Sequence, residues 1–146
     1  MGAATVLLAA GNELPSNVVG VIADCPYSSA KDIICKVCED MKLPPEKVIP
    51  LIRFSGKVFG RFDVVAGDVI SAVAKAKVPM LLIHGEEDLF VPCKMSEEIY
   101  QANPALVQKE FFPEAGHGIS YIVDTERYTA LSTAFVETCI TTWAEQ

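Results

Sequence analysis

The sequence has little positive charge. Its 146 residues include 12 Lys and Arg against 19 Asp and Glu, which gives a net charge of −7. The basic residues are scattered along the chain, as Lys31, Lys36, Lys42, Lys75 and Lys77 illustrate. Because proteins hold nucleic-acid phosphates with clusters of Lys and Arg, we expect no nucleic-acid partner.

Long apolar runs are also missing. No stretch approaches the ~20 consecutive apolar residues of a membrane-spanning helix, so we expect no membrane span. The chain is nevertheless 51% hydrophobic, which suggests surface that a partner covers. Its apolar start, residues 1–10, lacks the basic leader and the cleavage-site break of a signal peptide.

The cysteines follow neither a disulfide pattern nor a metal pattern. Their number, five, is odd, so they cannot all pair within the chain, which favours a reducing, cytoplasmic location. Cys35 and Cys38 form a C-x-x-C pair, but a zinc site needs two further ligands and the sequence has no second Cys/His pair. We expect core cysteines, no metal and no cofactor.

What the sequence does contain is an alternation of strand and helix patterns. Apolar, mostly β-branched or aliphatic runs predict buried strands at 18–25, 79–84 and 107–112. Helices are expected at 2–10, 29–41 (capped by Ser28 or Ser29), from Pro45 to about 60, 68–75, 92–100 and from Asp124 onwards. This order predicts a three-layer α/β fold with a mostly parallel sheet.

The length suggests only part of such a domain. A chain of 146 residues fits a single domain, residues 1–146, whereas complete layered α/β domains commonly have ~200–250 residues. Residues 44–77 separate the first two predicted strands and are a possible cap or lid over a site. Phe54, Val58 and Phe59 in this segment, with Phe62, either line an acyl pocket or pack on the sheet, and the sequence leaves both open.

Two polar residues follow predicted strands. Asp88 comes shortly after the strand at 79–84, and His117 lies between two glycines after the strand at 107–112. Ligands of open α/β sheets gather at the carboxyl ends of strands, and a carboxylate there can hold the tautomer of a catalytic histidine. Glu86 and Glu87 compete with Asp88 in the same loop, and Asp24 at the end of the first strand is another candidate acid.

Three phrases, taken together, resemble the α/β-hydrolase family. They are Met1-Gly2-Ala3-Ala4-Thr5-Val6-Leu7, then Ile83-His84-Gly85-Glu86-Glu87-Asp88, then Glu114-Ala115-Gly116-His117-Gly118. In that family the nucleophile lies in Gly-x-Ser-x-Gly, and the acid and the base follow it in this order. The first phrase is similar to the helix after that serine, and the resemblance covers the whole chain as the C-terminal half of a lipase-, esterase- or serine aminopeptidase-like hydrolase.

The resemblance assigns roles by position. It implies that Asp88 is the triad acid and His117 the base, while Met1 corresponds to the residue after the nucleophile, whose backbone N–H would help to form the oxyanion hole. The serine itself would precede Met1. The serines of the chain lie outside any Gly-x-Ser-x-Gly context, including Ser120, which is close to His117 in sequence.

Two functional hypotheses follow. The first is a C-terminal fragment of a serine hydrolase, which in its intact form would cleave small esters or amides through an acyl-enzyme, and which alone would be inactive. The second is a non-enzymatic interaction module that survives by self-association. In either case the strand at 18–25 would present an open edge and the helix at 2–10 would expose Val6, Leu7 and Leu8, so we expect a homodimer.

Overall fold

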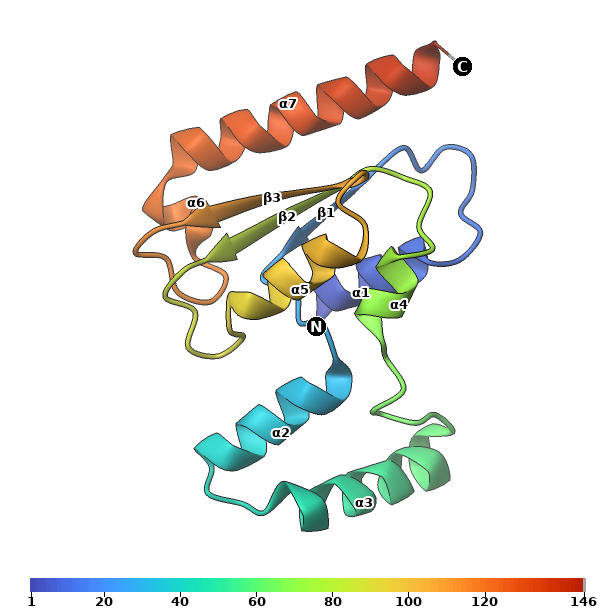
Figure 1. Cartoon of the computed structure of the whole chain (residues 1–146), viewed down its shortest axis with the longest axis vertical. Coiled ribbons are helices and arrows are strands. Elements are labelled where there is room, and N and C mark those ends of the chain that lie inside the picture. Colours follow the sequence, from blue (N-terminus) through green and yellow to red (C-terminus); the bar gives the residue numbers. More distant parts are fainter. Residues whose placement is uncertain (146) are drawn as a thin grey trace.

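A computed structural model describes residues 1–145 (Figure 1). In this part of the chain the strands β1 (Val21–Asp24), β2 (Met80–Gly85) and β3 (Val107–Phe112) form one parallel sheet with β2 in the centre. In register, Met80 of β2 lies opposite Val21 of β1 and Val107 of β3. All three predicted strands are therefore present, and the predicted α/β fold class is confirmed.

Helices alternate with the strands and cover both faces of the sheet. They are α1 (Gly2–Ala10), α2 (Ala30–Asp40), α3 (Pro45–Ser55), the π-helical turn η1 (Gly56–Gly60), α4 (Val69–Val73), α5 (Lys94–Ala102), α6 (Ser120–Val123) and α7 (Thr125–Ala144). Figure 1 shows α1, α4 and α5 on one face of the sheet and α7 on the other, which makes three layers. Within residues 1–145, no helix combines the length and apolarity that crossing a membrane requires.

The central strand explains why its sequence is apolar at every position. Met80 and Leu82 point into the core that α1, α4 and α5 cover, whereas Leu81 and Ile83 point into the core beneath α7. All four side chains are buried. A strand enclosed on both faces loses the polar alternation of a surface strand, and each such side chain stabilises the fold by about 1.5–3 kcal/mol through burial.

Side-chain caps fix the starts of three helices. Ser29 Oγ accepts a hydrogen bond from the backbone N–H of Asp32 at 3.2 Å, and Asp124 accepts one from that of Arg127 at 2.9 Å. The carboxylate of Asp68 does the same at the start of α4. Each cap satisfies an N–H that the first turn of a helix leaves unpaired, so two of the sequence-predicted caps, Ser29 and Asp124, are confirmed.

Two details of packing differ from the sequence prediction. Leu7 was expected on the surface, but it is fully buried because α1 packs against both β1 and α4. Val6 is 41% exposed, as expected. At the other end of the chain, helical spacing in the sequence from Asp124 onwards predicts one apolar stripe that includes Phe135, Cys139, Ile140 and Trp143. Phe135 and Cys139 of α7 are buried on the sheet, whereas Ile140 and Trp143 stay half exposed, because the last turns of α7 extend beyond the sheet (Figure 1).

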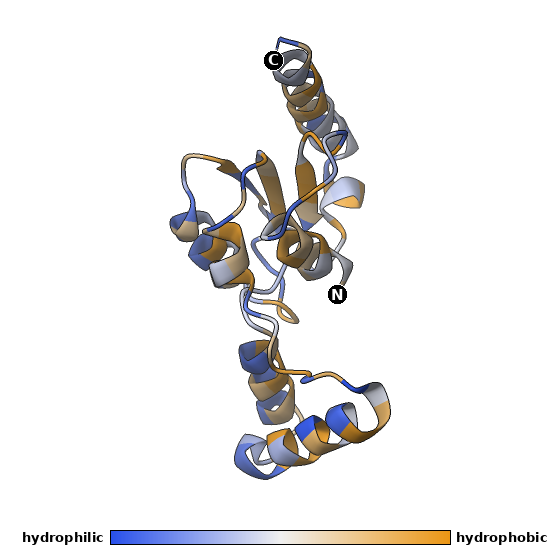
Figure 2. Cartoon of the chain, turned by 90° about the vertical axis from the view of Figure 1, so that its right-hand side faces the viewer, coloured by the Kyte–Doolittle hydropathy of each residue, from blue (hydrophilic) through white to orange (hydrophobic). Residues whose placement is uncertain are grey.

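The segment at 44–77 divides into two parts. Helix α4 lies in the core, with Val69 and Val73 fully buried. By contrast, α3 and η1 project from the body beside α2 (Figures 1 and 2), and α3 runs through Pro50 without a break. The four aromatic and aliphatic side chains expected to line a pocket or pack on the sheet are all more than half exposed: Phe54, Val58, Phe59 and Phe62.

Candidate active site

Asp88 lies in the loop after β2, at the carboxyl edge of the sheet. Its side chain is fully buried. Oδ1 accepts hydrogen bonds from the backbone N–H groups of Phe90 at 2.9 Å and Val91 at 2.8 Å. These two bonds fix the carboxylate and leave Oδ2 to face the loop that follows β3.

His117 occupies that second loop and contacts Asp88 directly. Its Nδ1 lies 2.6 Å from Asp88 Oδ2, and its side chain is 41% exposed. Because an ionised carboxylate can only accept, Nδ1–H is the donor in this bond. The neutral imidazole therefore keeps the lone pair on Nε2, which is the protonation state that a general base needs.

Close approach of the two loops brings the pair together. The backbone N–H of Glu87 donates to Ala115 O at 3.0 Å, and that of Glu86 donates to Phe112 O at 3.0 Å. Gly85 permits this approach, since a Cβ at that position would lie 2.1 Å from Ala115 O. Glu86 and Glu87, which competed with Asp88 in the sequence, are exposed, and their backbone amides join the loops.

Burial and hydrogen bonding shift the pKa of the Asp88 carboxyl in opposite directions. Burial alone would raise the pKa of its carboxyl, but the Val91 N–H, the His117 imidazole and the Phe90 N–H together hold that pKa below its usual value. The carboxylate is thus ionised at neutral pH. It can stabilise an imidazolium at His117 if that ring takes up a proton.

His84, the other histidine of the chain, is structural, a role that its place at the end of a predicted strand, before Gly85, favours. Its ring is fully buried in β2. Nδ1 lies 2.6 Å from Ser96 Oγ and Nε2 lies 2.9 Å from Val91 O. A neutral ring that donates from Nε2 and accepts at Nδ1 satisfies both contacts, so this imidazole braces the loop that carries Asp88.

Cys25 joins the site, and the sequence prediction missed it. It follows β1 with a φ of 51°, a left-handed conformation that is uncommon for a residue with a side chain. Its Sγ accepts the Gly118 N–H at 3.3 Å and donates to Asp24 Oδ1 at 3.2 Å. A signal was available, since residues at the carboxyl ends of neighbouring parallel strands meet at one edge of the sheet.

Cys25, Asp88 and His117 present sulfur, oxygen and nitrogen atoms within 4.8 Å of one another. These are the donor types that zinc binds. The thiol is poorly suited to that role, because burial raises the pKa of Cys25 to about 12 and a metal ligand must be a thiolate.

Asp24, the alternative acid, is engaged elsewhere. Its Oδ2 accepts from the Tyr128 hydroxyl at 3.1 Å, and burial beside this carboxylate raises the pKa of Tyr128 to about 12. Met1, the candidate oxyanion residue, precedes α1 and is 89% exposed. Its carbonyl accepts from the N–H of Thr5 at 3.1 Å.

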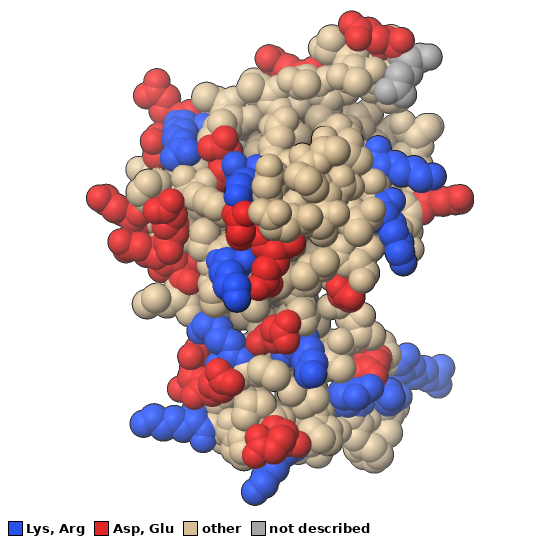
Figure 3. Space-filling view, viewed as in Figure 1, with Lys and Arg blue, Asp and Glu red and all other residues tan. Residues whose placement is uncertain are grey.

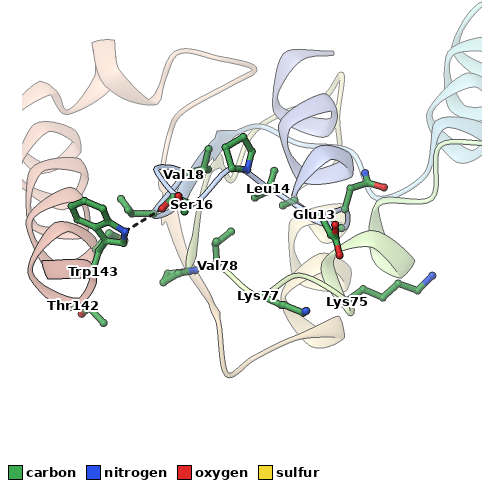
Figure 4. Close-up of a pocket in the computed structure, with 16 residues that line it drawn as sticks. Glu13, Leu14, Ser16, Val18, Lys75, Lys77, Val78, Thr142 and Trp143 are labelled. Atoms are coloured by element: carbon green, nitrogen blue, oxygen red, sulfur yellow. Dashed lines mark hydrogen bonds between the residues drawn. The ribbon is translucent and has the colours of Figure 1, made fainter. Parts of the chain in front are cut away.

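A hollow in the described part of the chain lies away from this pair. It measures about 630 Å³ and lies among residues at the amino ends of the strands, including Val19, Val78 and Pro79. Figure 4 shows its wall, where the Trp143 Nε1–H donates to Ser16 O at 3.1 Å. This position is at the end of the sheet opposite Asp88 and His117.

Comparisons with known proteins agree on the fold. No family model matches the chain. The uncharacterized protein YqkD of Bacillus subtilis is 24% identical over 138 residues, which cover 94% of this chain and 45% of that protein. The esterase Pf2001 of Pyrococcus furiosus superposes with a TM-score of 0.67 at 20% identity, over 96% of this chain and 51% of that chain. MGS-M2, an α/β hydrolase from a deep-sea metagenome library, gives 0.63 at 20% identity, over 93% and 62%.

The chain has an α/β-hydrolase fold. A third enzyme with this likeness is the Pyrococcus horikoshii acylaminoacyl peptidase, with a TM-score of 0.61 at 17% identity over 92% of this chain and 22% of that chain. The chain therefore spans about half the length of YqkD and of the esterase Pf2001, and a smaller share of the longer acylaminoacyl peptidase. The expected resemblance to part of an α/β hydrolase is confirmed at the level of the fold.

Three serines of the chain are enclosed by this fold. Ser28, Ser96 and Ser120 are fully buried. Ser28 Oγ donates to Glu98 at 2.8 Å, and Ser96 contacts His84. Ser120 Oγ, the sequence neighbour of His117, has no hydrogen-bond partner among the described residues.

Proposed function

We propose that the chain is the C-terminal half of a serine hydrolase that cleaves esters or amides through an acyl-enzyme. In this proposal His117 is the general base, Asp88 orients it, and the nucleophile belongs to a segment other than residues 1–146. The backbone N–H of Met1, or of the residue equivalent to it in a longer protein, would contribute to the oxyanion hole. The substrate is a small ester or amide, and the protein acts in the cytoplasm.

One observation carries the proposal: the 2.6 Å bond between His117 Nδ1 and the buried Asp88 Oδ2, in a His117 side chain that is 41% exposed. A catalytic histidine needs a partly accessible Nε2 and a buried partner on Nδ1. A surface histidine in a loop needs neither. The esterase and peptidase names of proteins with this fold support the same class of reaction.

The proposal predicts that esterase activity requires a serine upstream of residues 1–146. Residues 1–146 alone should hydrolyse a short-chain nitrophenyl ester no faster than the His117→Ala variant does. A longer protein that adds an upstream Gly-x-Ser should be active, and replacing that serine should lower kcat on the order of a millionfold. His117→Ala in the longer protein should cause a loss of similar size.

A fluorophosphonate probe gives the opposing outcome. Labelling of residues 1–146 at one serine would show an unrecognised nucleophile within them and would contradict the proposal. The coding sequence upstream of Met1 gives an independent check, because an in-frame Gly-x-Ser is expected there.

A second candidate function is a self-associating module without catalysis. The observation that favours it is the open edge of β1, which pairs with β2 on one side only in the described chain. A genuine translation start at Met1, with no Gly-x-Ser upstream, would favour this alternative.

In the hydrolase proposal, residues 44–77 act as a cap through their projecting part, α3 and η1.

A further inference from the structure

The projecting part of the chain exposes an unusual number of large apolar side chains. We call residues 41–63 the cap segment; it comprises the end of the α2–α3 turn, α3, η1 and the residues up to Asp63. Seven of its apolar side chains are between 42% and 85% exposed: Met41, Leu43, Leu51, Phe54, Val58, Phe59 and Phe62. In a soluble protein, apolar surface gathered in this way marks a site of interaction.

The same segment has a net positive charge, although the chain as a whole is acidic. It has five basic and two acidic residues, a net charge of +3, while the other 123 residues have seven basic and seventeen acidic ones, a net charge of −10. Figure 3 shows blue side chains mixed with red ones on the lower part of the molecule, and a denser red region on the left of the body. The basic residues are Lys42, Lys47, Arg53, Lys57 and Arg61.

The spacing of these residues matches that of an interfacial helix. Leu51, Phe54 and Val58 repeat at intervals of three and four, so they share one face of the helix. Arg53 and Lys57 repeat at an interval of four beside that face, and both pair with Asp63, at 2.6 Å and 3.5 Å. Long basic side chains beside an apolar stripe can extend to lipid phosphates while the stripe is immersed.

We propose that the cap segment is a docking surface for an anionic lipid bilayer. Its Phe and Leu side chains would enter the boundary between headgroups and acyl chains, and its lysines and arginines would bind the lipid phosphates. The rest of the molecule, with its net charge of −10, would be repelled from the same surface, and this repulsion orients the chain with the cap towards the membrane. This inference is independent of the hydrolase proposal.

Charge argues for a bilayer over a second copy of the chain. A two-fold contact through the cap segment would place Lys42, Lys47 and Arg61 of each copy near like charges, and these three have no ion pair among the described residues. Like charges across an interface oppose association. An anionic bilayer satisfies both the apolar and the basic side chains at once.

Vesicle sedimentation tests the proposal with the whole chain. The protein should bind vesicles that contain phosphatidylglycerol and fail to bind pure phosphatidylcholine vesicles. Phe54→Asp combined with Phe59→Asp should weaken binding roughly a hundredfold or more. Lys42→Gln combined with Lys47→Gln should weaken it about 30-fold, at about fivefold per charge.

Matched controls test whether the loss of vesicle binding is specific to substitutions in the cap segment. Ile122→Asp with Ile140→Asp removes two apolar side chains of 75% and 51% exposure on α6 and α7, and Lys75→Gln with Lys77→Gln removes two exposed charges elsewhere. Both controls should bind anionic vesicles like the parent chain. All substituted side chains are exposed, so folding should be retained, as circular dichroism can show.

Three results would overturn the proposal. The parent chain could fail to bind anionic vesicles. The phenylalanine variant could bind as well as its control. Finally, sedimentation velocity without lipid could show a dimer that only the cap variants dissociate, which would assign the surface to a second copy.

Discussion

At the scale of single residues, the main question is why Asp88 and not Asp24 holds His117. Both carboxylates follow parallel strands at the same edge of the sheet. Asp24 is occupied by the Tyr128 hydroxyl and the Cys25 thiol. Asp88 is fixed through Oδ1 by two backbone N–H groups, and its Oδ2 lies 2.6 Å from His117 Nδ1 and 3.3 Å from His84 Nε2. A carboxylate held in this way can orient a base without changing its own position.

Asp88→Asn should destabilise the fold at neutral pH and not in acid. The folded state lowers the pKa of Asp88, so the stability that its charge adds is present above the unfolded value of about 3.9. That contribution is lost as the pH falls through the lower folded-state pKa. We expect the variant to lose about 1.5–3 kcal/mol of unfolding free energy at pH 7. Urea unfolding of both proteins from pH 7 downwards measures the difference, and a gap in unfolding free energy that does not narrow as the pH falls would contradict this account.

The thiols should differ sharply in reactivity. Cys25 is buried, and its burial raises the pKa to about 12, whereas Cys35 on α2 is partly exposed. Because only the thiolate attacks an alkylating agent, iodoacetamide at pH 8 should modify Cys35 well before Cys25. Peptide mass spectrometry resolves the two sites. In urea the difference should disappear, and early labelling of Cys25 in the folded protein would show that its pocket is open.

How far the sequence predicted the site follows from the same residues. The contact between Asp88 and His117 was expected from the strand order and is present, while their catalytic roles stay a prediction. The position of Cys25 after a strand placed it at this edge of the sheet, but its contact with the His117 loop depends on a left-handed turn that nothing in the surrounding Asp-Cys-Pro indicates. The role of His84 as a brace depends on a partner twelve residues away, Ser96.

At the scale of elements, patterns with strong local signals were predicted well. The helix at 2–10 and the strand at 107–112 match α1 and β3 within their predicted bounds. The strand at 18–25 is shorter in the structure, Val21–Asp24, because β1 is limited to the residues that face β2. Helix α6, the four residues Ser120–Val123, had no signal of its own, since β-branched residues favour strands.

Gly85→Ala should disrupt the junction between β2 and the His117 loop. The new Cβ would lie 2.1 Å from Ala115 O, a backbone atom, so one of the two loops must move. We expect a loss of about 3 kcal/mol in unfolding free energy, the upper range for overpacking. Gly2→Ala is the control, because its Cβ meets nothing within 4 Å. Denaturant unfolding of both variants measures the effect, and equal stability would show that the loops yield without cost.

At the scale of the whole molecule, the sheet is unequally covered. Its two faces are closed by helices, but the edge of β1 carries an apolar hollow of about 310 Å³. Val6, Leu14, Val18, Val21 and Ile22 are among its lining residues. The N–H groups of Val21 and Cys25 point towards β2, so in a parallel ladder those of Ile22 and Asp24 point to the open side. An edge with both apolar surface and free backbone groups favours pairing with another chain.

Self-association through this edge should make residues 1–146 a homodimer. A two-fold contact would let β1 pair with its copy and extend the sheet across both chains, and a stable interface of this kind buries roughly 2,000 Å². Sedimentation at micromolar concentration should then give about twice the 15.8 kDa chain mass. Val6→Lys places a charge in the hollow and should yield the monomer, whereas Val136→Lys on α7, where the parent side chain is 43% exposed against 41% for Val6, should not. A parent chain that sediments as a monomer with this edge in water would rule the dimer out. In that case the surface around Val6 would have to be covered by a further segment of the same polypeptide or by a different protein.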